Sequence, residues 1–155
     1  MEVRKIPRGT FVTGALAAVA LGLPLLTVAL ETVARTFHVG PTEASRLQIL
    51  TFAGIFAGFP TFVTGGGVAR LVAHRVAERT APRIARGVVL GTIAMGIAGV
   101  GAALLTVVPL GNLPEAPARW WPLLAAGLVV GVVTGTAIGL LVAGRTVRHR
   151  QRTAA

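Results

Sequence analysis

The sequence contains no cysteine and no aspartate, and Ser45 is its only serine. Without cysteine the chain has no disulfide framework, no thiolate metal site and no thiol nucleophile. Without aspartate it has no Ser-His-Asp set, and its residues offer no paired carboxylates for acid-base chemistry. We therefore predict that the protein is not an enzyme and that it holds no metal and no cofactor.

Histidine and lysine are also scarce. The three histidines are His38, His74 and His149, and each lies in a polar segment instead of an apolar run. No histidine pair is therefore placed to ligate a haem inside a membrane. Lys5 is the only lysine, so the glycine-rich loop followed by lysine that cradles phosphates does not occur.

Charge is low for a water-soluble domain. Charged residues make up 13% of the chain and hydrophobic residues 54%, against about 25% and about 45–50% in ordinary globular proteins. The apolar residues form four runs, each close to the roughly 20 residues that a helix needs to cross a bilayer. We predict an all-α integral membrane protein, a four-helix bundle that is one domain over residues 1–155, with spans at about 10–33, 46–68, 87–110 and 120–144.

The first run also resembles a signal peptide, because Arg4, Lys5 and Arg8 precede it. The hydrophobic core of a signal peptide is usually about 7–15 residues long, and this run is longer. The candidate cleavage context at Thr32-Val33-Ala34 is poor as well. We therefore interpret the run as the first span.

Basic residues flank the apolar runs and give the net charge of +10. The chain has 15 basic residues. Arg35, Arg46 and Arg119 lie in the two connections assigned to one side of the membrane, and all the others lie on the opposite side. By the positive-inside rule both termini are cytoplasmic, and no nucleic-acid partner is expected. Arginine used almost to the exclusion of lysine, with abundant alanine and glycine, is typical of a GC-rich bacterial gene. We predict a multi-pass protein of the bacterial inner membrane.

Glycines recur every four residues along the fourth span and form a glycine zipper. This spacing leaves one helix face without side chains, where another backbone can pack closely. Shorter sets occur on the second and third spans. The predicted helix-packing residues are Gly54, Gly58, Gly87, Gly91, Gly99, Gly127, Gly131, Gly135 and Gly139. The fourth-span strip fits the third span inside the bundle, and it equally fits a partner or a second copy.

The second span contains Pro60 and, further on, Gly65, Gly66 and Gly67. Each glycine lowers helix propensity by about 1 kcal/mol relative to alanine. Broken helices of this kind expose carbonyls to ions in some transporters. Here the count from Leu47 places the glycines at the inner membrane boundary, so a hinge or the end of the helix is the preferred interpretation.

Residues 68–86 sort into a basic and an apolar face and predict a short cytoplasmic amphipathic helix. Its basic side chains would bind anionic lipid headgroups; they are Arg70, Arg75, Arg79, Arg83 and Arg86. At the opposite membrane surface Trp120 and Trp121 are predicted interface anchors. Glu31 and Arg35, four residues apart, predict an ion pair that ends the first span, in preference to a proton or cation site. Residues 145–155 form a basic tail.

The spans carry hydroxyls but few other polar groups. Thr134 and Thr136, on either side of Gly135, are the residues that we would test in a pore for neutral solutes. The first functional hypothesis is a non-catalytic membrane subunit that packs into a homo-oligomer or a larger inner-membrane complex. The alternative is a small channel or carrier for a neutral or weakly polar solute. A third hypothesis is an adaptor that binds anionic lipid.

Overall fold

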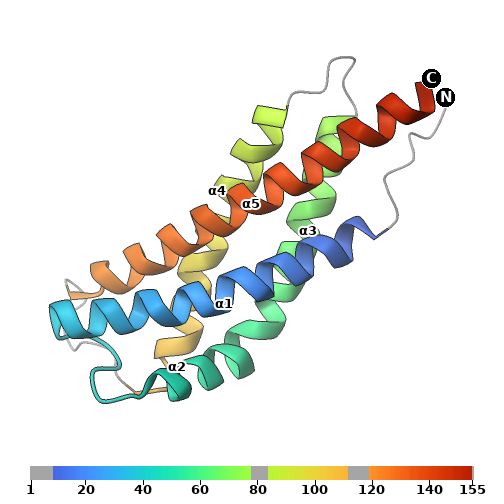
Figure 1. The fold of residues 1–155 in the computed structure, drawn as a ribbon. Coiled ribbons are helices and arrows are strands. Elements are labelled where there is room, and N and C mark those ends of the chain that lie inside the picture. The colour runs from blue at the N-terminus through green and yellow to red at the C-terminus, as the bar shows by residue number, and fades with distance from the viewer. Residues whose placement is uncertain (1–8, 78–83, 112–118, 155) are drawn as a thin grey trace.

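The computed structural model describes residues 9–77, 84–111 and 119–154, and every element in these ranges is helical (Figure 1). The elements are α1 (Thr10–Phe37), α2 (Arg46–Phe52), the π-helical η1 (Ala53–Ala57), α3 (Gly58–Ala77), α4 (Ile84–Val107) and α5 (Trp121–Ala154). Four helical segments are long and apolar enough to cross a membrane: Thr10–Phe37, Arg46–Ala77, Ile84–Val107 and Trp121–His149. The predicted all-α class is thereby confirmed, together with four helical segments that are long and apolar enough to span a membrane.

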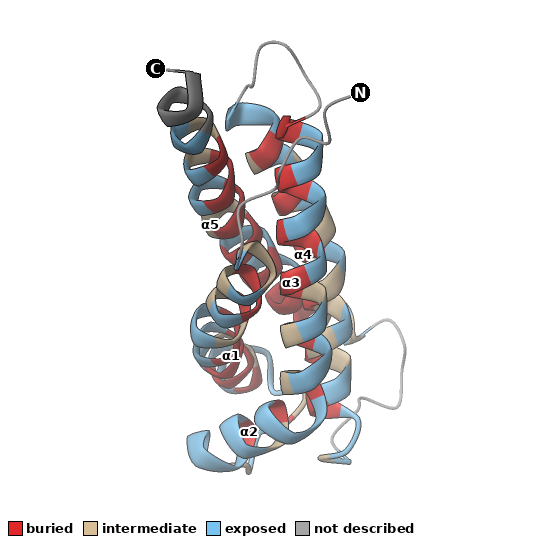
Figure 2. Cartoon of the chain, turned by 90° about the vertical axis from the view of Figure 1, so that its right-hand side faces the viewer, coloured by how far each residue is buried: buried red, intermediate tan, exposed pale blue. Residues whose placement is uncertain are grey.

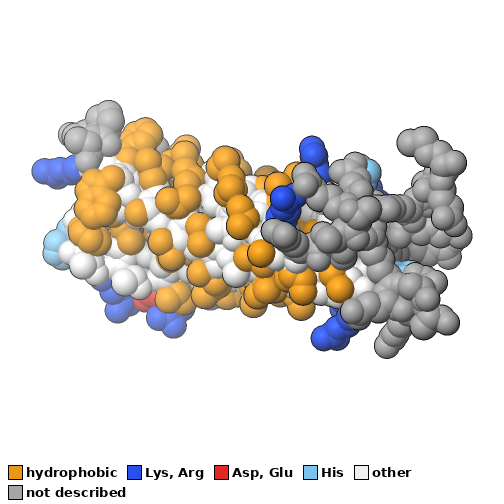
Figure 3. All heavy atoms as spheres, turned by 90° about the horizontal axis from the view of Figure 1, so that it is seen from above, with side chains coloured by type: hydrophobic (Ala, Val, Ile, Leu, Met, Phe, Trp, Pro, Cys, Tyr) orange, Lys and Arg blue, Asp and Glu red, His pale blue; other side chains and the backbone are white. Residues whose placement is uncertain are grey.

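The helices form one bundle in which the start of α1 and the end of α5 lie at the same end (Figure 1). The most extensive contacts are those of α4 with α5 and of α1 with α3. Buried residues face the inside of the bundle, and exposed residues cover its outside (Figure 2). Hydrophobic side chains cover the middle of the surface seen in Figure 3, with arginines towards its two ends. This distribution matches an apolar bilayer core between two polar surfaces.

The contact between α4 and α5 is made by backbone against backbone. A Cβ atom built on Gly91 would lie 2.5 Å from the carbonyl oxygen of Gly135, and one on Gly127 would lie 2.5 Å from that of Gly99. Real Cβ atoms essentially never come within 3.0 Å of such neighbours. The structure thus places the glycines of the third and fourth spans against each other, inside the chain. They are Gly87, Gly91, Gly99, Gly127, Gly131, Gly135 and Gly139.

A second close approach joins α1 and α3. A Cβ atom on Gly14 would lie 2.6 Å from the carbonyl oxygen of Gly65, and one on Gly65 would lie 2.8 Å from that of Gly14. Gly66 lies under the ring of Phe11, and that ring packs edge-on against Phe62 with 6.0 Å between centroids. Small residues at one crossing therefore hold α1 and α3 together, as they do for α4 and α5.

The helix neither ends nor unwinds at Gly65–Gly67, where we expected a hinge or a helix end. It runs on to Ala77. Packing of Gly65 and Gly66 against α1 offsets the low helix propensity of glycine. Pro60 likewise lies within the helical segment, and Gly67 faces outwards with no atom near its Cβ position.

The irregular part of the second span lies earlier, at the π-helical turn η1. A π turn holds one more residue than an α turn and rotates the following faces. Ala53 and Ala57 are fully buried in this segment, whereas Gly54 is exposed and has nothing within 4 Å of a built Cβ. Gly58 makes ordinary contacts with Ala53 and Leu23. Within the chain, Ala53 and Ala57 therefore make the packing contacts that were predicted for Gly54 and Gly58.

Residues 68–77 do not form a separate surface helix, which corrects the prediction for the segment 68–86. They are the last turns of α3, and their apolar face is buried in the bundle, where Val68, Val72 and Val76 join a hydrophobic cluster. Among the predicted headgroup residues, Arg70, Arg75 and Arg86 are exposed. Arg79 and Arg83 lie outside the described residues.

The two largest of the three hydrophobic clusters of the described core lie towards its two ends. The tail-side cluster, near the start of α1 and the end of α5, includes Ala18, Val68, Val72, Met95, Ile138 and Val142. The loop-side cluster, at the opposite end, includes Leu26, Leu30, Ile49, Val107, Leu123 and Val130.

Alanine substitutions at two glycines of α4 test the α4–α5 contact. Gly99→Ala should destabilise the protein by about 1–3 kcal/mol, because its Cβ would overlap the backbone of Gly127 and Gly131. Gly101→Ala is the matched control; its Cβ meets no atom within 4 Å, and the gain in helix propensity should stabilise the protein by up to about 1 kcal/mol. The measurement is thermal unfolding in detergent, and equal unfolding midpoints for the two variants would contradict the packing described here.

Candidate functional site

Two of the places where the described bundle buries polar side chains are candidates for a functional site. The first is Glu31 near the end of α1, which is 8% exposed. The second is a cavity at mid-bundle that carries threonine hydroxyls. No group of three or more metal-ligating side chains occurs among the described residues.

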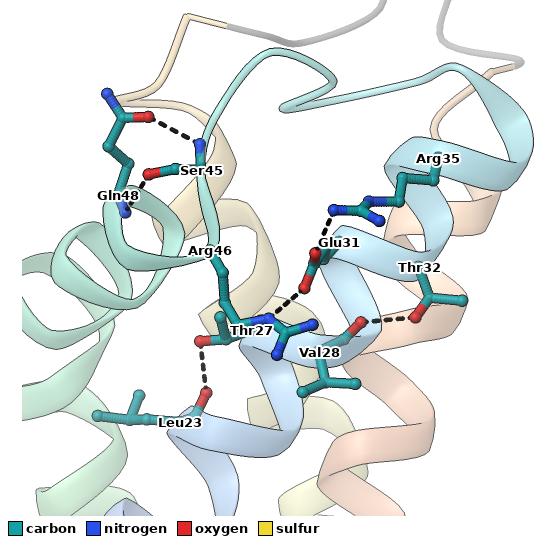
Figure 4. A network of polar contacts seen from close by, with 9 residues as sticks. All are labelled: Leu23, Thr27, Val28, Glu31, Thr32, Arg35, Ser45, Arg46 and Gln48. Atoms are coloured by element: carbon teal, nitrogen blue, oxygen red, sulfur yellow. Dashed lines mark hydrogen bonds and ion pairs between the residues drawn. The ribbon is translucent and has the colours of Figure 1, made fainter.

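Glu31 is bound by two arginines (Figure 4). Nε of Arg46 donates to one carboxylate oxygen at 2.6 Å, and Nη2 of Arg35 lies 2.7 Å from the other. Both carboxylate oxygens therefore have a cationic partner. This arrangement joins α1 to the start of α2 and leaves no free carboxylate oxygen for ion coordination.

The turn after α1 brings Arg46 to Glu31. His38 and Gly40 adopt left-handed backbone conformations, with φ of 52° and 79°, and Ser45 is the N-cap of α2. Ser45 Oγ accepts from the backbone N–H of Gln48, and Gln48 Oε1 accepts from that of Ser45 (Figure 4), a capping box. The four-residue spacing predicts the Glu31–Arg35 pair, whereas no local spacing predicts Arg46, which lies 15 residues from Glu31.

The cavity occupies about 240 Å³ between α1, α3, α4 and α5. An apolar cavity of about 150 Å³ is large enough to admit benzene, so a small organic group fits here. Its lining is almost wholly apolar. The lining residues are Gly22, Leu23, Leu26, Pro60, Thr61, Thr64, Met95, Ala98, Gly99, Gly101, Ala102, Leu105, Val130, Gly131 and Thr134.

Missing side chains create this space. Gly22 of α1 faces Thr134 and Thr61, and a Cβ built on it would lie 3.7 Å from Thr134 Oγ1, an ordinary contact distance. Gly99 and Gly131 line the cavity as well, although they also belong to the close α4–α5 contact. Glycines that bring two helices together therefore also leave a hollow beside them.

Thr134 differs from the other threonines of the bundle. The common arrangement in the described helices is a hydroxyl that donates to the carbonyl four residues earlier, as seen for Thr27, Thr64, Thr106 and Thr146. Thr134 is 1% exposed, and its Oγ1 has no hydrogen-bond partner among the described residues. A buried hydroxyl without a partner costs about 1–3 kcal/mol, so this atom is suited to a bound molecule.

Thr136, the other threonine singled out by the sequence, has a structural role. Its hydroxyl lies 2.9 Å from that of Thr92 on α4 and donates to the Val132 carbonyl. The structure therefore separates the two candidates: Thr136 links α4 to α5, and Thr134 lines the cavity.

The cavity lies between the two hydrophobic clusters. Leu26 and Val130 belong to the loop-side cluster, and Met95 belongs to the tail-side cluster. Beyond them, Leu30 and Val107 at one end and Val72 and Ile138 at the other are almost fully buried. Packed side chains thus separate the cavity from both ends of the bundle.

The predicted interface anchors lie near the Glu31 end. Trp121 begins α5 and is 58% exposed; its ring packs edge-on against Phe37, with 5.2 Å between centroids. Trp120 immediately precedes the helix and its carbonyl accepts from the backbone N–H of Leu123. Both tryptophans are placed where the fourth span begins.

Comparison with protein-family models, with curated proteins and with solved structures finds no match to this chain.

Proposed function

We propose that this chain is a non-catalytic four-span protein of the bacterial cytoplasmic membrane that binds a small, weakly polar molecule in its intramembrane cavity. The observation that carries the proposal is an otherwise apolar cavity of about 240 Å³ lined by Thr134, whose buried hydroxyl has no hydrogen-bond partner among the described residues. Binding sites for small molecules are mostly apolar, with a few polar groups that orient the ligand. This cavity has that composition.

The lining favours binding over catalysis. Its side chains are aliphatic apart from the three threonines, and none of them is ionisable. Intramembrane catalysis and ion-coupled transport generally depend on ionisable groups placed within the membrane. A ligand held by these residues is neutral, because no lining side chain offers a counter-charge.

The packed clusters favour a binding site over a continuous pore. A pore for polar solutes needs a path to both membrane surfaces, and the loop-side and tail-side clusters fill the bundle at both ends of the cavity. The carrier form of the solute hypothesis is retained, since a carrier holds its solute in a closed site. In the structure Gly65–Gly67 lie in regular helix, so the hinge has no support there.

The charge distribution supports cytoplasmic termini. Exposed arginines near the start of α1 and the end of α5 include Arg70, Arg75, Arg86, Arg145 and Arg148. The opposite end carries Arg35 and Arg46, both engaged by Glu31, and the exposed Arg119. An excess of basic residues marks the cytoplasmic side. The same residues suit anionic lipid headgroups, which makes lipid a partner without requiring a separate adaptor function.

Assembly with other subunits, or with copies of the same chain, is a second candidate function. The glycines of α4 and α5 are used inside the bundle, so an assembly surface would lie elsewhere. The second span offers a candidate assembly surface. Leu47 is 73% exposed and Phe59 is 75% exposed there, and Gly54 on the same span has no atom within 4 Å of a built Cβ. On this hypothesis Gly54→Leu lowers the mass of the complex purified in mild detergent. A wild-type chain that runs as a monomer would rule it out.

The proposed topology can be tested with single cysteines, because the chain has none of its own. Thr42→Cys, in the connection before α2, should react with a membrane-impermeant maleimide on intact cells. Arg148→Cys, near the end of α5, should react only after the membrane is permeabilised. The cysteine-free chain is the control, and the reverse labelling pattern would contradict cytoplasmic termini.

Cyclohexanol, a compact ring with one hydroxyl, tests binding in the cavity. It should raise the thermal unfolding midpoint of the protein in lipid nanodiscs, because a ligand that binds the folded state stabilises it. Thr134→Val should weaken binding by about 2- to 10-fold, which corresponds to one lost hydrogen bond. Gly22→Ala, which fills space beside Thr134, should weaken it further.

Thr106→Val is the matched control for this experiment. Thr106 is also fully buried, but its hydroxyl bonds to its own helix and it does not line the cavity. Each variant is compared with its own midpoint without cyclohexanol. An equal cyclohexanol effect in all variants, or none in the wild type, would refute the proposed function.

A further inference from the structure

The cavity has an open side between α3 and α4. Among its lining residues, Pro60 of α3 and Gly101 of α4 are exposed, and Leu105 of α4 is 42% exposed. These residues therefore belong both to the cavity wall and to the outer surface. The contact between α3 and α4 is also less extensive than those of α1 with α3 and α4 with α5.

Gly101 keeps this side open. A Cβ atom built on Gly101 would meet no atom within 4 Å, in contrast to Gly99 two residues earlier, which contacts α5. Gly101 is therefore not required for helix packing. The absence of its side chain leaves room between the exposed edge of α3 and that of α4.

The surroundings of the opening are apolar. Phe59 and Val63 on α3 are 75% and 44% exposed, and Ile97 on α4 is 71% exposed. Gly22 and Leu23, on the far wall of the cavity, lie near the middle of α1. The opening is thus at the depth where a spanning bundle faces lipid chains, while the two clusters separate the cavity from the membrane surfaces.

The interior chemistry restricts what can enter by this route. Thr134 Oγ1 can donate one hydrogen bond and accept others, and Thr64, whose proton is used by the Pro60 carbonyl at 2.6 Å, can still accept. A hydroxyl or carbonyl oxygen matches these groups. A phosphate does not, because a charged headgroup would be buried without a cationic partner.

We infer that the ligand is a neutral single-chain lipid with one hydroxyl or carbonyl oxygen, which enters sideways from the bilayer between α3 and α4. This inference rests on the proposed binding function. The oxygen end binds at Thr134, and the cavity holds the adjoining part of the chain. The rest of the chain leaves past Gly101 and Leu105 and stays among the lipids.

The test uses a long-chain fatty alcohol with a diazirine near its hydroxyl, mixed into nanodiscs that contain the full chain. After irradiation, mass spectrometry should find the label on cavity residues of α4 and α5, around Ala98–Ala102 and Val130–Thr134. Thr134→Val should reduce this labelling by about 2- to 10-fold. Labelling confined to lipid-facing residues such as Phe59 and Ile97 would overturn the inference.

Two substitutions narrow the opening without touching the packed helix contacts. Gly101→Phe places a ring where the structure has free space, and Leu105→Trp enlarges an exposed side chain at the same edge. Both should lose the cavity labelling. Gly67→Phe is the control, since Gly67 is equally free of neighbours and does not line the cavity. The use of two blocking variants keeps the test valid if one of them fails to fold.

The outcomes separate this inference from the proposed function. If cyclohexanol stabilises the protein but the fatty alcohol labels both blocking variants as it labels the wild type, lateral entry is wrong and the binding site stands. If a short, water-soluble diazirine alcohol labels the cavity equally in all variants, entry is from the aqueous phase and the lipid class is wrong. If cyclohexanol has no effect on the wild type, the binding function itself fails.

Discussion

The structure depends on the close backbone approach of α4 and α5 at their glycines. Gly91 against Gly135 and Gly99 against Gly127 leave no room for a Cβ atom. In a bilayer the lipid chains are as apolar as leucine, so helices gain little from hydrophobic burial against each other and associate through close packing instead. Glycine permits that packing. The same interaction, repeated between Gly14 and Gly65, attaches α1 to α3.

The close approach also explains the cavity. Where two helices meet through glycines, no side chains project beside the contact, and Gly99 and Gly131 form part of the cavity wall. Small residues contribute to the wall elsewhere too, since α1 presents Gly22 and α4 presents Ala98 and Ala102. The same glycines therefore produce both the close contact between α4 and α5 and the cavity beside it.

The polar groups of the bundle are stabilised in different ways at different depths. The carboxylate of Glu31 lies towards one end of the bundle and is neutralised by two arginines. Most of the hydrogen-bonded threonines in the described helices donate to a carbonyl of their own helix, which makes a hydroxyl tolerable in lipid. Thr134 is buried and is not satisfied in this way. A partner from outside the chain would remove the cost, and this is the reason that the site is assigned to a ligand.

The sequence by itself determined the number and approximate position of the helices that are long and apolar enough to span a membrane. Hydropathy and the position of arginines depend on single segments and on their distance from a membrane surface, so they can be read without the fold. The spacing of the glycines from Gly127 to Gly139 also identified a face for close packing. The Glu31–Arg35 pair was predictable because its spacing is local.

Tertiary structure decided the rest, because those features depend on contacts between distant segments. Gly65 and Gly66 stay helical because α1 packs on them, and the irregular turn lies at Ala53–Ala57 instead. Arg46 reaches Glu31 through a turn that no periodicity predicts. The cavity needs four helices at one depth. Thr134 and Thr136 look alike in sequence, and a rotation of two residues around α5 sends one hydroxyl to the cavity and the other to Thr92.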